Sequence, residues 1–231
     1  MYKYIEEFFL FTSKKETFNG MKILEVGSRN VNGSLRRIIE KYNPKTYIGV
    51  DIEYGPGVDK KCNANELINI FKDDYFDVII CTEVLEHVPD WKEVISNIKG
   101  VLKPDGLIFI STRSKGFGYH GFPYDFWRYE LKDFHIIFSD FEILCLAKDI
   151  GIPGVLFWGK KPKTYNEINL THYKLWSIIK RKRTKTISMS SVKIFLMFLP
   201  IYKEVILPYI INPIRKSFET RYTIKRKNYG Q

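Results

Sequence analysis

Short apolar runs recur through the first two thirds of the chain, and segments with helical spacing separate them. The runs carry few charged residues, as is typical of parallel strands that are buried on both faces of a sheet. Apolar residues at positions 91, 94, 95, 98, 101 and 102 instead repeat with the period of one helix face. The predicted strands are residues 22–26, 46–51, 76–82 and 107–111, and the predicted helices are residues 2–18, 34–42, 66–71, 91–102 and 131–138.

Two further apolar runs, residues 141–147 and 155–159, favour an antiparallel pair that closes the sheet. The alternation of strands and helices predicts an α/β fold. We expect a Rossmann-like, doubly wound, largely parallel sheet of seven strands whose last strand is antiparallel. Because the pattern ends near residue 161, residues 1–162 are the expected main domain, and residues 163–231 are an expected helical, basic C-terminal extension.

The positive charge of the chain is concentrated in its C-terminal part. The net charge is +11, and residues 160–231 hold 17 Lys and Arg against 3 Glu, so the preceding residues are close to neutral. Such an asymmetry indicates contact of the extension with a polyanion, either a lipid surface or a nucleic acid.

Two apolar blocks in the extension, residues 194–202 and 205–211, are flanked by basic clusters. Each block contains a proline, and neither reaches the about 18 uncharged residues of a membrane-spanning helix. The blocks favour an interfacial segment on an anionic membrane or, with equal weight, a helical appendage that packs on the core or on a second subunit. RNA binding by the basic clusters is a third and weaker interpretation.

The cysteines and the N-terminal segment indicate the compartment. Cys62, Cys81 and Cys145 are odd in number and widely spaced, which is typical of free thiols in a reducing environment. The N-terminal segment lacks the basic and then apolar layout of a signal peptide. We therefore expect a cytoplasmic protein, with an anionic membrane surface as a candidate partner of the extension.

The first two predicted strands end in residues that suit a nucleoside pocket. The first strand leads through Glu25 to Gly27, and the second ends in Asp51, 24 positions after that glycine. In an open α/β sheet such a glycine lets a ligand approach the backbone, and the aspartate accepts hydrogen bonds from ribose hydroxyls. Arg29 stands where a dinucleotide fingerprint has its second glycine, which argues against a pyrophosphate. An adenosine cofactor without phosphates, such as S-adenosylmethionine, fits this pattern.

Four segments in register resemble one family, the class I S-adenosylmethionine-dependent methyltransferases, and within it the methyltransferase type 11-like proteins. The resemblance covers roughly residues 20–160 and implies an enzyme that uses S-adenosylmethionine as its methyl donor. The segments are residues 23–27 (ILEVG), 47–51 (YIGVD), 76–88 (FDVIICTEVLEHV) and 101–107 (VLKPDGL).

The resemblance also implies which residues hold the cofactor. Asp51 would bind both ribose hydroxyls, and Ile52 would pack on the adenine. The amide oxygen of Asn63 could accept a hydrogen bond from the adenine amino group, although a turn is an equally good interpretation of this residue. From the methionine end of the cofactor to the adenine, the implied set is Glu25, Gly27, Thr82, Glu83, Asp51, Ile52, Asn63 and Ala64.

A hydroxyl acceptor would need a base that removes its proton. Residues 114–129 follow the last parallel strand and combine many aromatic residues with three glycines and a proline. We expect this segment to cover the substrate, and packing of its aromatic residues on the sheet edge is the structural alternative. His120 or Asp125 is the preferred base, and His87 is the third candidate.

A metal site is an alternative use of the same region. Glu83, Glu86 and His87 have i, i+3 and i+4 spacing, and His120 could complete a ligand set. This arrangement resembles the magnesium-dependent branch that methylates 2′-hydroxyls at RNA 3′ ends. Whether a metal is bound stays undecided from the sequence.

The aromatic segment, together with the expectation that relatives similar at residues 123–128 (PYDFWR) accompany glycan assembly, favours O-methylation of a sugar, a lipid-linked glycan or a related small acceptor. Two alternatives stay open. One is a magnesium-dependent RNA 2′-O-methyltransferase, which salt-sensitive RNA binding would support. The other is a cofactor-binding scaffold without catalysis.

Overall fold

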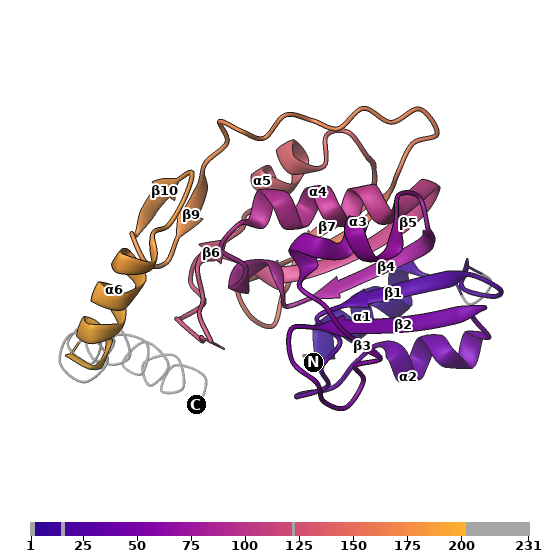
Figure 1. Cartoon of the computed structure of the whole chain (residues 1–231), viewed down its shortest axis with the longest axis horizontal. Coiled ribbons are helices and arrows are strands. Elements are labelled where there is room, and N and C mark those ends of the chain that lie inside the picture. The colour runs from indigo at the N-terminus through magenta and orange to yellow at the C-terminus, as the bar shows by residue number, and fades with distance from the viewer. Residues whose placement is uncertain (1–2, 15–16, 122, 202–231) are drawn as a thin grey trace, which may run out of the picture. The chain divides into compact units, whose positions relative to one another are not determined.

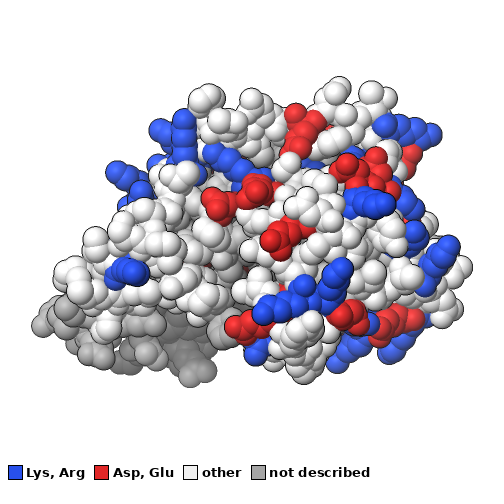
Figure 2. All heavy atoms as spheres, in the orientation of Figure 1, with Lys and Arg blue, Asp and Glu red and all other residues white. Residues whose placement is uncertain are grey.

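The structure is a computed structural model that describes residues 3–14, 17–121 and 123–201 (Figure 1). The chain folds as two compact units, residues 1–186 and residues 187–231. The first unit contains both sheets and every predicted site residue. On the face that Figure 2 shows, acidic and basic side chains of this unit are interspersed.

A seven-stranded mixed sheet is the centre of the first unit, with the order β3-β2-β1-β4-β5-β8-β7. The strands from β3 to β5 are parallel to one another, and β8 runs antiparallel to both of its neighbours. The predicted Rossmann-like sheet and its antiparallel last strand are therefore confirmed. The strands are β1 (Lys22–Val26), β2 (Thr46–Asp51), β3 (Lys60–Lys61), β4 (Phe76–Thr82), β5 (Leu102–Arg113), β7 (Glu142–Lys148) and β8 (Gly154–Lys160).

Helices cover both faces of this sheet (Figure 1). On one face Ile5 and Phe9 pack with Ile39 against the sheet residues Val78 and Phe109. The opposite face carries the longer helix of residues 91–101, whose apolar positions are buried as its spacing predicted. The helices are α1 (Lys3–Thr12), α2 (Arg36–Ile39), α3 (Leu67–Phe71), α4 (Trp91–Val101) and α5 (Leu131–Ile137), with the 3₁₀ turns η2 (Glu40–Tyr42), η3 (Ala64–Glu66) and η4 (Leu85–His87).

The first helix is shorter than the predicted residues 2–18. The hydroxyl groups of Thr12 and Ser13 donate hydrogen bonds to the carbonyl oxygens of Phe8 and Phe9 at 2.8 and 2.6 Å. Such side-chain bonds to the preceding turn compete with continuation of the helix. The helix therefore ends at Thr12.

A second, three-stranded sheet was not predicted. It has the order β10-β9-β6 and joins β6 (Trp127–Arg128), β9 (Leu175–Ser177) and β10 (Lys182–Thr184) by antiparallel pairing. Residues 163–186 are thus part of the first compact unit, whereas the sequence placed its boundary at residue 162. Strands of two or three residues carry no measurable period, so the hydrophobic pattern could not reveal this pairing.

The described part of the second unit is the helix α6 (Met189–Ile201), which contains Pro200. Ile194, Met197 and Phe198 on this helix are more than half exposed. The predicted apolar block at residues 205–211 and the basic residues after it lie outside the described residues. Among the residues that are described, no helix has the length and apolar character needed to cross a membrane.

Candidate active site

The parallel strands β1, β2, β4 and β5 end at one edge of the sheet, and the predicted cofactor residues gather there. Gly27 follows β1 with φ +75°, and a Cβ atom added to it would lie 2.1 Å from Cγ2 of Val84. The turn after β1 therefore packs directly on the segment that follows β4. This close approach requires glycine at position 27.

Asp51 presents its carboxylate at the end of β2. Its two oxygens accept hydrogen bonds from the backbone N–H groups of Arg29 at 3.2 Å and Glu53 at 3.1 Å. A carboxylate has about four acceptor positions, so Asp51 keeps capacity for the hydroxyls of a ribose. Ile52 beside it is 47% exposed, as a surface that packs on a base would be. The guanidinium group of Arg29 pairs with Glu53 at 2.5 Å.

Glu25 lies inside the sheet and not on its surface. It is 2% exposed, and it accepts hydrogen bonds from the Ser34 hydroxyl at 2.8 Å and the Tyr47 hydroxyl at 3.0 Å. Burial raises the pKa of Glu25 to about 7, against the opposing effect of these bonds. Glu25 is therefore partly protonated near neutral pH.

Asn63 and Ala64 form the start of the turn η3. The amide oxygen of Asn63 accepts the N–H of Asn65 at 3.2 Å, so this side chain caps the turn. Ala64 is buried. This hydrogen bond supports the interpretation of Asn63 as a turn residue, and its contact with the adenine stays a prediction.

Thr82 and Glu83 lie at the end of β4, where Thr82 pairs with Ser111 of β5. Glu83 has φ +60°, accepts a hydrogen bond from the Ser111 hydroxyl at 2.9 Å and forms an ion pair with Arg113. Burial and the nearby charge of Glu86 raise the pKa of Glu83 to about 7. The Glu83 carboxylate is thus bound to β5.

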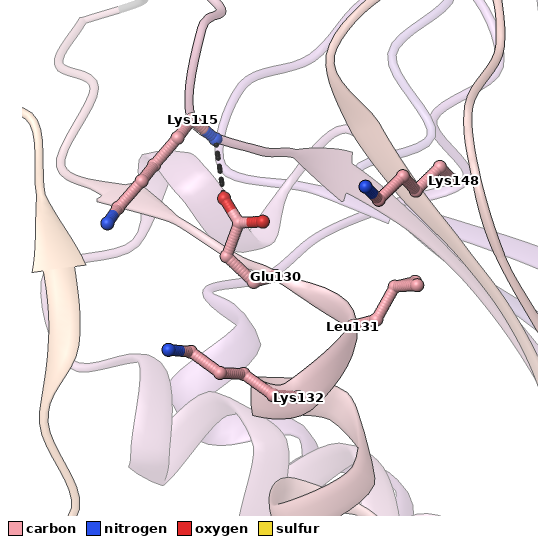
Figure 3. A pocket seen from close by; sticks show the side chains of 5 residues that line it. All are labelled: Lys115, Glu130, Leu131, Lys132 and Lys148. Carbon is pink, nitrogen blue, oxygen red and sulfur yellow. Dashed lines mark hydrogen bonds between the residues drawn. The ribbon is translucent and has the colours of Figure 1, made fainter.

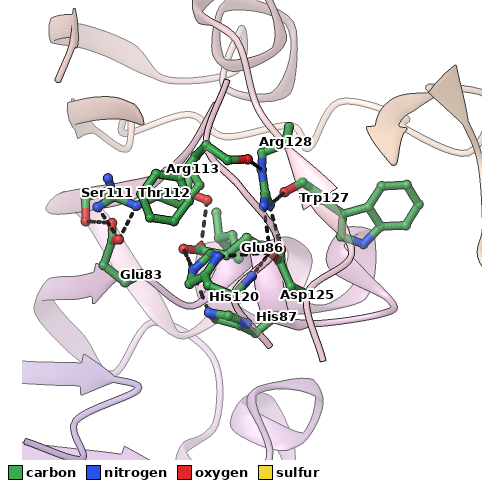
Figure 4. Close-up of polar contacts among 12 residues, drawn as sticks. Glu83, Glu86, His87, Ser111, Thr112, Arg113, His120, Asp125, Trp127 and Arg128 are labelled. Carbon is green, nitrogen blue, oxygen red and sulfur yellow. Dashed lines mark hydrogen bonds and ion pairs between the residues drawn. The ribbon is translucent and has the colours of Figure 1, made fainter. Parts of the chain in front are cut away.

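Three polar side chains converge beside this edge (Figure 4). Glu86 and His87 come from η4 after β4, and His120 comes from the loop after β5. The Glu86 Oε1 atom lies 3.7 Å from Nε2 of His120 and 4.0 Å from Nε2 of His87. The two imidazole rings meet edge to face with centroids 4.8 Å apart. The three residues are called the Glu86 cluster below.

Each member of the Glu86 cluster is held by a second contact. Nδ1 of His87 lies 2.7 Å from the carbonyl oxygen of Tyr124, which can only accept, so His87 donates. Nδ1 of His120 lies 2.9 Å from Oδ2 of Asp125. The Thr112 hydroxyl donates to Glu86 Oε2 at 2.8 Å. The contacts aim Oε1 and the two Nε2 atoms at one another.

The charges of the Glu86 cluster reinforce each other. Burial alone would raise the pKa of Glu86, but the His120 and His87 side chains hold that pKa below its usual value. Burial disfavours the charged form of His120, yet its hydrogen bonds to the carboxylates of Asp125 and Glu86 raise its pKa to about 9. A completely buried carboxylate therefore stays ionised and attracts positive charge.

Asp125, the other preferred base, is fully buried, and both of its carboxylate oxygens already accept hydrogen bonds. Arg128 donates two hydrogen bonds to its carboxylate at 2.5 and 2.6 Å. Burial opposes the charge of Asp125, but these bonds and His120 lower its pKa. Arg128 also donates to the carbonyl oxygens of Phe117 and Gly118 at 3.1 and 2.7 Å. The pair thus fixes the loop that carries His120.

The aromatic segment divides into two parts. Residues 125–129 are buried and include β6, and the Trp127 indole donates to the Val88 carbonyl oxygen at 2.9 Å. Residues 114–121, which include His120, form a loop that is half-buried or exposed. Packing of the aromatic residues, the structural alternative, thus accounts for residues 125–129. Covering of the substrate stays a prediction for residues 114–121.

Comparison with known proteins identifies the family. Residues 1–151, more than half of the chain, match the family described as methyltransferase domain. The chain belongs to this methyltransferase family. With the sheet described above, it is a class I S-adenosylmethionine-dependent methyltransferase, and S-adenosylmethionine is its cofactor.

Curated relatives of this methyltransferase match only over short segments. A ubiquinone biosynthesis O-methyltransferase from Haemophilus ducreyi is 60% identical over 51 residues, which are 22% of this chain and 18% of that protein. A protein of the same name from Idiomarina loihiensis is 41% identical over 64 residues, 28% of this chain and 26% of that protein. The matches thus span about a quarter or less of these relatives.

Solved structures share the fold of this methyltransferase. An S-adenosylmethionine-dependent methyltransferase from Mesorhizobium loti has a TM-score of 0.53 at 14% identity, covering 68% of this chain and 98% of that chain. Another from Aquifex aeolicus has a TM-score of 0.51 at 14% identity, covering 68% of this chain and 88% of that chain. At this identity the likeness concerns the fold, so the acceptor must be argued from the site.

The residues at the sheet edge fit the cofactor of this methyltransferase. The free acceptor capacity of Asp51 and the exposed side chain of Ile52 suit a ribose and a base, and the side-chain-free backbone at Gly27 suits a close ligand. Thr112 and Arg128 also support the Glu86 cluster, but neither residue was predicted as part of the site. Nothing about their positions in the sequence shows that they contact its members or the loop of His120.

A pocket is lined by residues after β5, at the start of α5 and at the end of β7 (Figure 3). Its Glu130 accepts the backbone N–H of Lys115 at 3.1 Å and caps α5. The lysines give the pocket a positive charge, which would favour an anionic ligand group. The lining residues are Lys115, Glu130, Leu131, Lys132 and Lys148.

Proposed function

We propose that this methyltransferase transfers a methyl group to a hydroxyl oxygen of a small-molecule acceptor. The observation that carries the proposal is the Glu86 cluster, which stands beside the strand ends that hold Gly27 and Asp51. A neutral amine nitrogen has a lone pair and can accept the methyl group before it loses a proton, whereas a hydroxyl needs a base that removes its proton. Two imidazoles and a carboxylate provide such a site.

The reaction requires alignment and removal of one proton. S-adenosylmethionine supplies a methyl group that is already activated on a sulfonium sulfur. The C–S bond breaks as the C–O bond forms, giving S-adenosylhomocysteine, a methyl ether and a proton. The protein aligns the acceptor oxygen with the methyl carbon. The Glu86 cluster binds the hydroxyl, and Nε2 of His87, whose Nδ1 donates to the Tyr124 carbonyl oxygen, takes up the proton.

This proposal assigns different roles to the three predicted catalytic residues. His87 and His120 contact the acceptor. Asp125 is a positioning residue, because Arg128 occupies both of its oxygens and His120 lies beside it. Glu86, which the sequence considered only as a metal ligand, joins the two histidines.

The names of the relatives support an oxygen acceptor. Both are called ubiquinone biosynthesis O-methyltransferases, although the matched segments are short. A phenolic hydroxyl is therefore the first acceptor class to test. The sugar and lipid-linked glycan acceptors predicted from the aromatic segment have no support among the relatives and are the second class.

The test is methyl transfer from radiolabelled S-adenosylmethionine to a panel of catechols, sugars, amines and a structured RNA. We expect methyl ethers from a hydroxyl acceptor. His87→Gln should abolish transfer and keep S-adenosylhomocysteine binding, whereas Asp51→Ala should abolish that binding through loss of the ribose contacts. Methylation of amines alone, or of RNA alone, would contradict the proposal.

We also propose that the C-terminal part contacts an anionic membrane surface. The exposed apolar side chains of α6 and the basic cluster at residues 180–185 support this interaction. The protein should sediment with vesicles that contain phosphatidylglycerol and stay in solution with pure phosphatidylcholine. Equal binding to both vesicle types, or to neither, would contradict it.

A further inference from the structure

We infer that the pocket beside α5 binds a phosphate group and that this group belongs to the acceptor. The pocket, lined by Lys115, Glu130, Leu131, Lys132 and Lys148, is called the lysine pocket below. Phosphate binding by itself does not depend on any reaction. Its assignment to the acceptor rests on the proposed function and narrows it, since the acceptor would be a phosphate ester that also carries the hydroxyl.

The lysine pocket has the size and the charge for an anionic group. Its volume is about 460 Å³, and small-molecule sites typically have roughly 300–1,000 Å³. Three ammonium groups stand against one carboxylate, and all three lysines are exposed, so a dissolved ligand can enter. Within the described residues none of these lysines forms an ion pair. Their charge is therefore available to a ligand.

Glu130 is bound by the backbone and does not neutralise the lysines. Its carboxylate accepts the N–H of Lys115 at 3.1 Å, and it also accepts the N–H of Asp133 in the capping box of α5. Figure 3 shows Lys148 on one side of this carboxylate and Lys115 and Lys132 on the other. Glu130 thus joins the loop after β5 to α5 and fixes the wall of the pocket.

The second sheet orients one of the three ammonium groups. Nζ of Lys115 lies 3.9 Å from the centroid of the Trp176 ring, and Trp176 of β9 pairs with Arg128 of β6. A contact of this kind holds an ammonium group in place and leaves its charge intact. A side chain that is already ordered loses less conformational entropy when it binds a ligand.

The composition of the lysine pocket favours phosphate over a carboxylate. A phosphate monoester carries about 1.5–2 negative charges at pH 7 and three acceptor oxygens. Lysine binds phosphate as a point charge with three donors, whereas a planar carboxylate is matched best by the paired N–H groups of arginine. In the described part of the chain the lining includes three lysines and no arginine.

The sheet topology places the lysine pocket at the edge that carries the cofactor residues. β5 and β7 both pair antiparallel with β8, so they run in the same direction and end at the same edge. Lys115 follows β5, and Lys148 is the last residue of β7. Arg113, which is buried, forms an ion pair with Glu83 after β4, and its Nη1 atom lies 3.7 Å from Asp149 after β7. Arg113 therefore connects the cofactor edge with the base of the pocket.

One acceptor molecule can reach both the lysine pocket and the Glu86 cluster. Five chain positions separate Lys115 from His120, so their Cα atoms are at most about 18 Å apart. Phe117 lies between them in the sequence, and its ring meets the His120 ring edge to face with centroids 4.7 Å apart. The loop that begins at the pocket is thus packed on the Glu86 cluster. This separation suits an acceptor whose phosphate and hydroxyl are one or two rings apart.

The first test measures phosphate binding without methyl transfer. The full-length protein is labelled briefly with acetic anhydride in sodium phosphate or in sodium chloride of equal ionic strength, and mass spectrometry gives the extent of acetylation at each lysine. Phosphate should slow acetylation of Lys115, Lys132 and Lys148 severalfold. Lys41 and Lys45, which are also exposed but lie outside the pocket, should be unchanged.

Two further probes distinguish the source of the phosphate. Glucose 6-phosphate should protect the three lysines as inorganic phosphate does, because the pocket accepts a phosphate on a small molecule. Vesicles that contain phosphatidic acid are the alternative source. Protection by these vesicles and by neither soluble probe would assign the lysines to a membrane surface and overturn the inference, as would the absence of protection by all three probes.

Charge-removing variants test whether the pocket itself is responsible. Lys132→Gln and Lys148→Gln replace exposed side chains, so the fold should be kept, and binding of S-adenosylhomocysteine confirms this. Each variant should weaken glucose 6-phosphate binding roughly tenfold in calorimetry, through loss of one charged hydrogen-bond donor. Lys41→Gln and Lys45→Gln remove the same charge elsewhere and should leave the affinity unchanged. Equal weakening in all four variants would show only general electrostatic attraction and overturn the inference.

The second test concerns the acceptor. Methyl transfer is compared for glucose and glucose 6-phosphate and for catechol and catechol monophosphate. The phosphorylated member of a pair should have the lower KM, and Lys148→Gln should raise that KM severalfold without a change in kcat, since a remote group is bound equally in the ground state and the transition state.

The two tests separate failure of the phosphate site from failure of the proposed function. Phosphate protection of the three lysines without transfer to any hydroxyl would refute the proposed function and support the site. Transfer to hydroxyls with no protection and no preference for phosphorylated acceptors would refute the phosphate site alone.

Discussion

The contact between Gly27 and Val84 gives a quantitative prediction about the cofactor edge. Alanine at position 27 would have to adopt φ +75° and would place its Cβ atom 2.1 Å from Cγ2 of Val84. The left-handed backbone costs an L-residue roughly 1–2 kcal/mol. Overpacking against a neighbouring side chain adds about 1–3 kcal/mol. Gly27→Ala should therefore lower the free energy of unfolding by about 2–5 kcal/mol.

Gly20→Ala is the matched control. Gly20 has nearly the same backbone angle, φ +70°, and nothing lies within 4 Å of an added Cβ atom. This variant should lose only the backbone contribution of roughly 1–2 kcal/mol. Urea denaturation followed by circular dichroism measures both values. Titration with S-adenosylhomocysteine should show weaker binding for Gly27→Ala and unchanged binding for Gly20→Ala.

A third variant tests the cause of the difference. In the double variant Gly27→Ala with Val84→Ala, the clashing Cγ2 atom is gone, and the nearest atom of residue 84 is Cβ at 3.5 Å, an ordinary contact. The double variant should recover most of the overpacking loss. The reasoning is refuted if Gly27→Ala is no less stable than Gly20→Ala, or if removal of the Val84 methyl groups recovers nothing.

Three further predictions concern buried charges. Burial raises the pKa of Glu25 from 4.5 to about 7, so its contribution to stability is full below pH 4.5 and is lost as the pH rises through about 7. As a result, the free energy of unfolding should fall by about 3 kcal/mol between pH 4.5 and pH values above 7. Glu25→Gln should abolish this pH-dependent fall, and free energies of unfolding measured for both proteins across that pH range would show it. Lys99→Ala should destabilise the fold by about 3–5 kcal/mol, because it leaves the buried Asp140 without its partner at 2.7 Å; a loss no larger than that of an exposed lysine would contradict this. Arg128→Met should cost a similar about 3–5 kcal/mol, because the buried Asp125 loses both hydrogen bonds from Arg128 and keeps only its contacts with His120; joint replacement with Asp125→Leu should recover part of the loss in urea denaturation.

The sequence predicted the central sheet well because burial on both faces leaves a strong apolar signal. The bounds of β1, β2 and β4 agree with their predicted runs to the residue. The carboxyl ends of parallel strands meet at one edge, so the places of Gly27 and Asp51 followed from topology alone. A strand order was not needed for that conclusion.

The remaining features depend on contacts between distant residues, which a hydrophobic pattern does not encode. The loop composition brought His120 and Asp125 to attention, but it could not show that Arg128 occupies both oxygens of Asp125. The glutamate at position 86 reads like a surface residue at a helix start, yet it is completely buried. Short strands such as β6 and β9 could not be predicted either, because each is stabilised by a partner strand that is distant in the sequence.

The pairing of β6 with β9 has a consequence for synthesis of the chain. Trp127 and Arg128 pair with residues that are about fifty positions later in the sequence, and Arg128 anchors the loop of His120. During translation the seven-stranded sheet is complete once β8 has left the ribosome, whereas β6 must wait for β9 before it has its partner strand. Chains that end between β8 and β9 would bind the cofactor with an unsecured acceptor loop, so premature termination there should yield protein that retains the methyl donor and transfers it poorly.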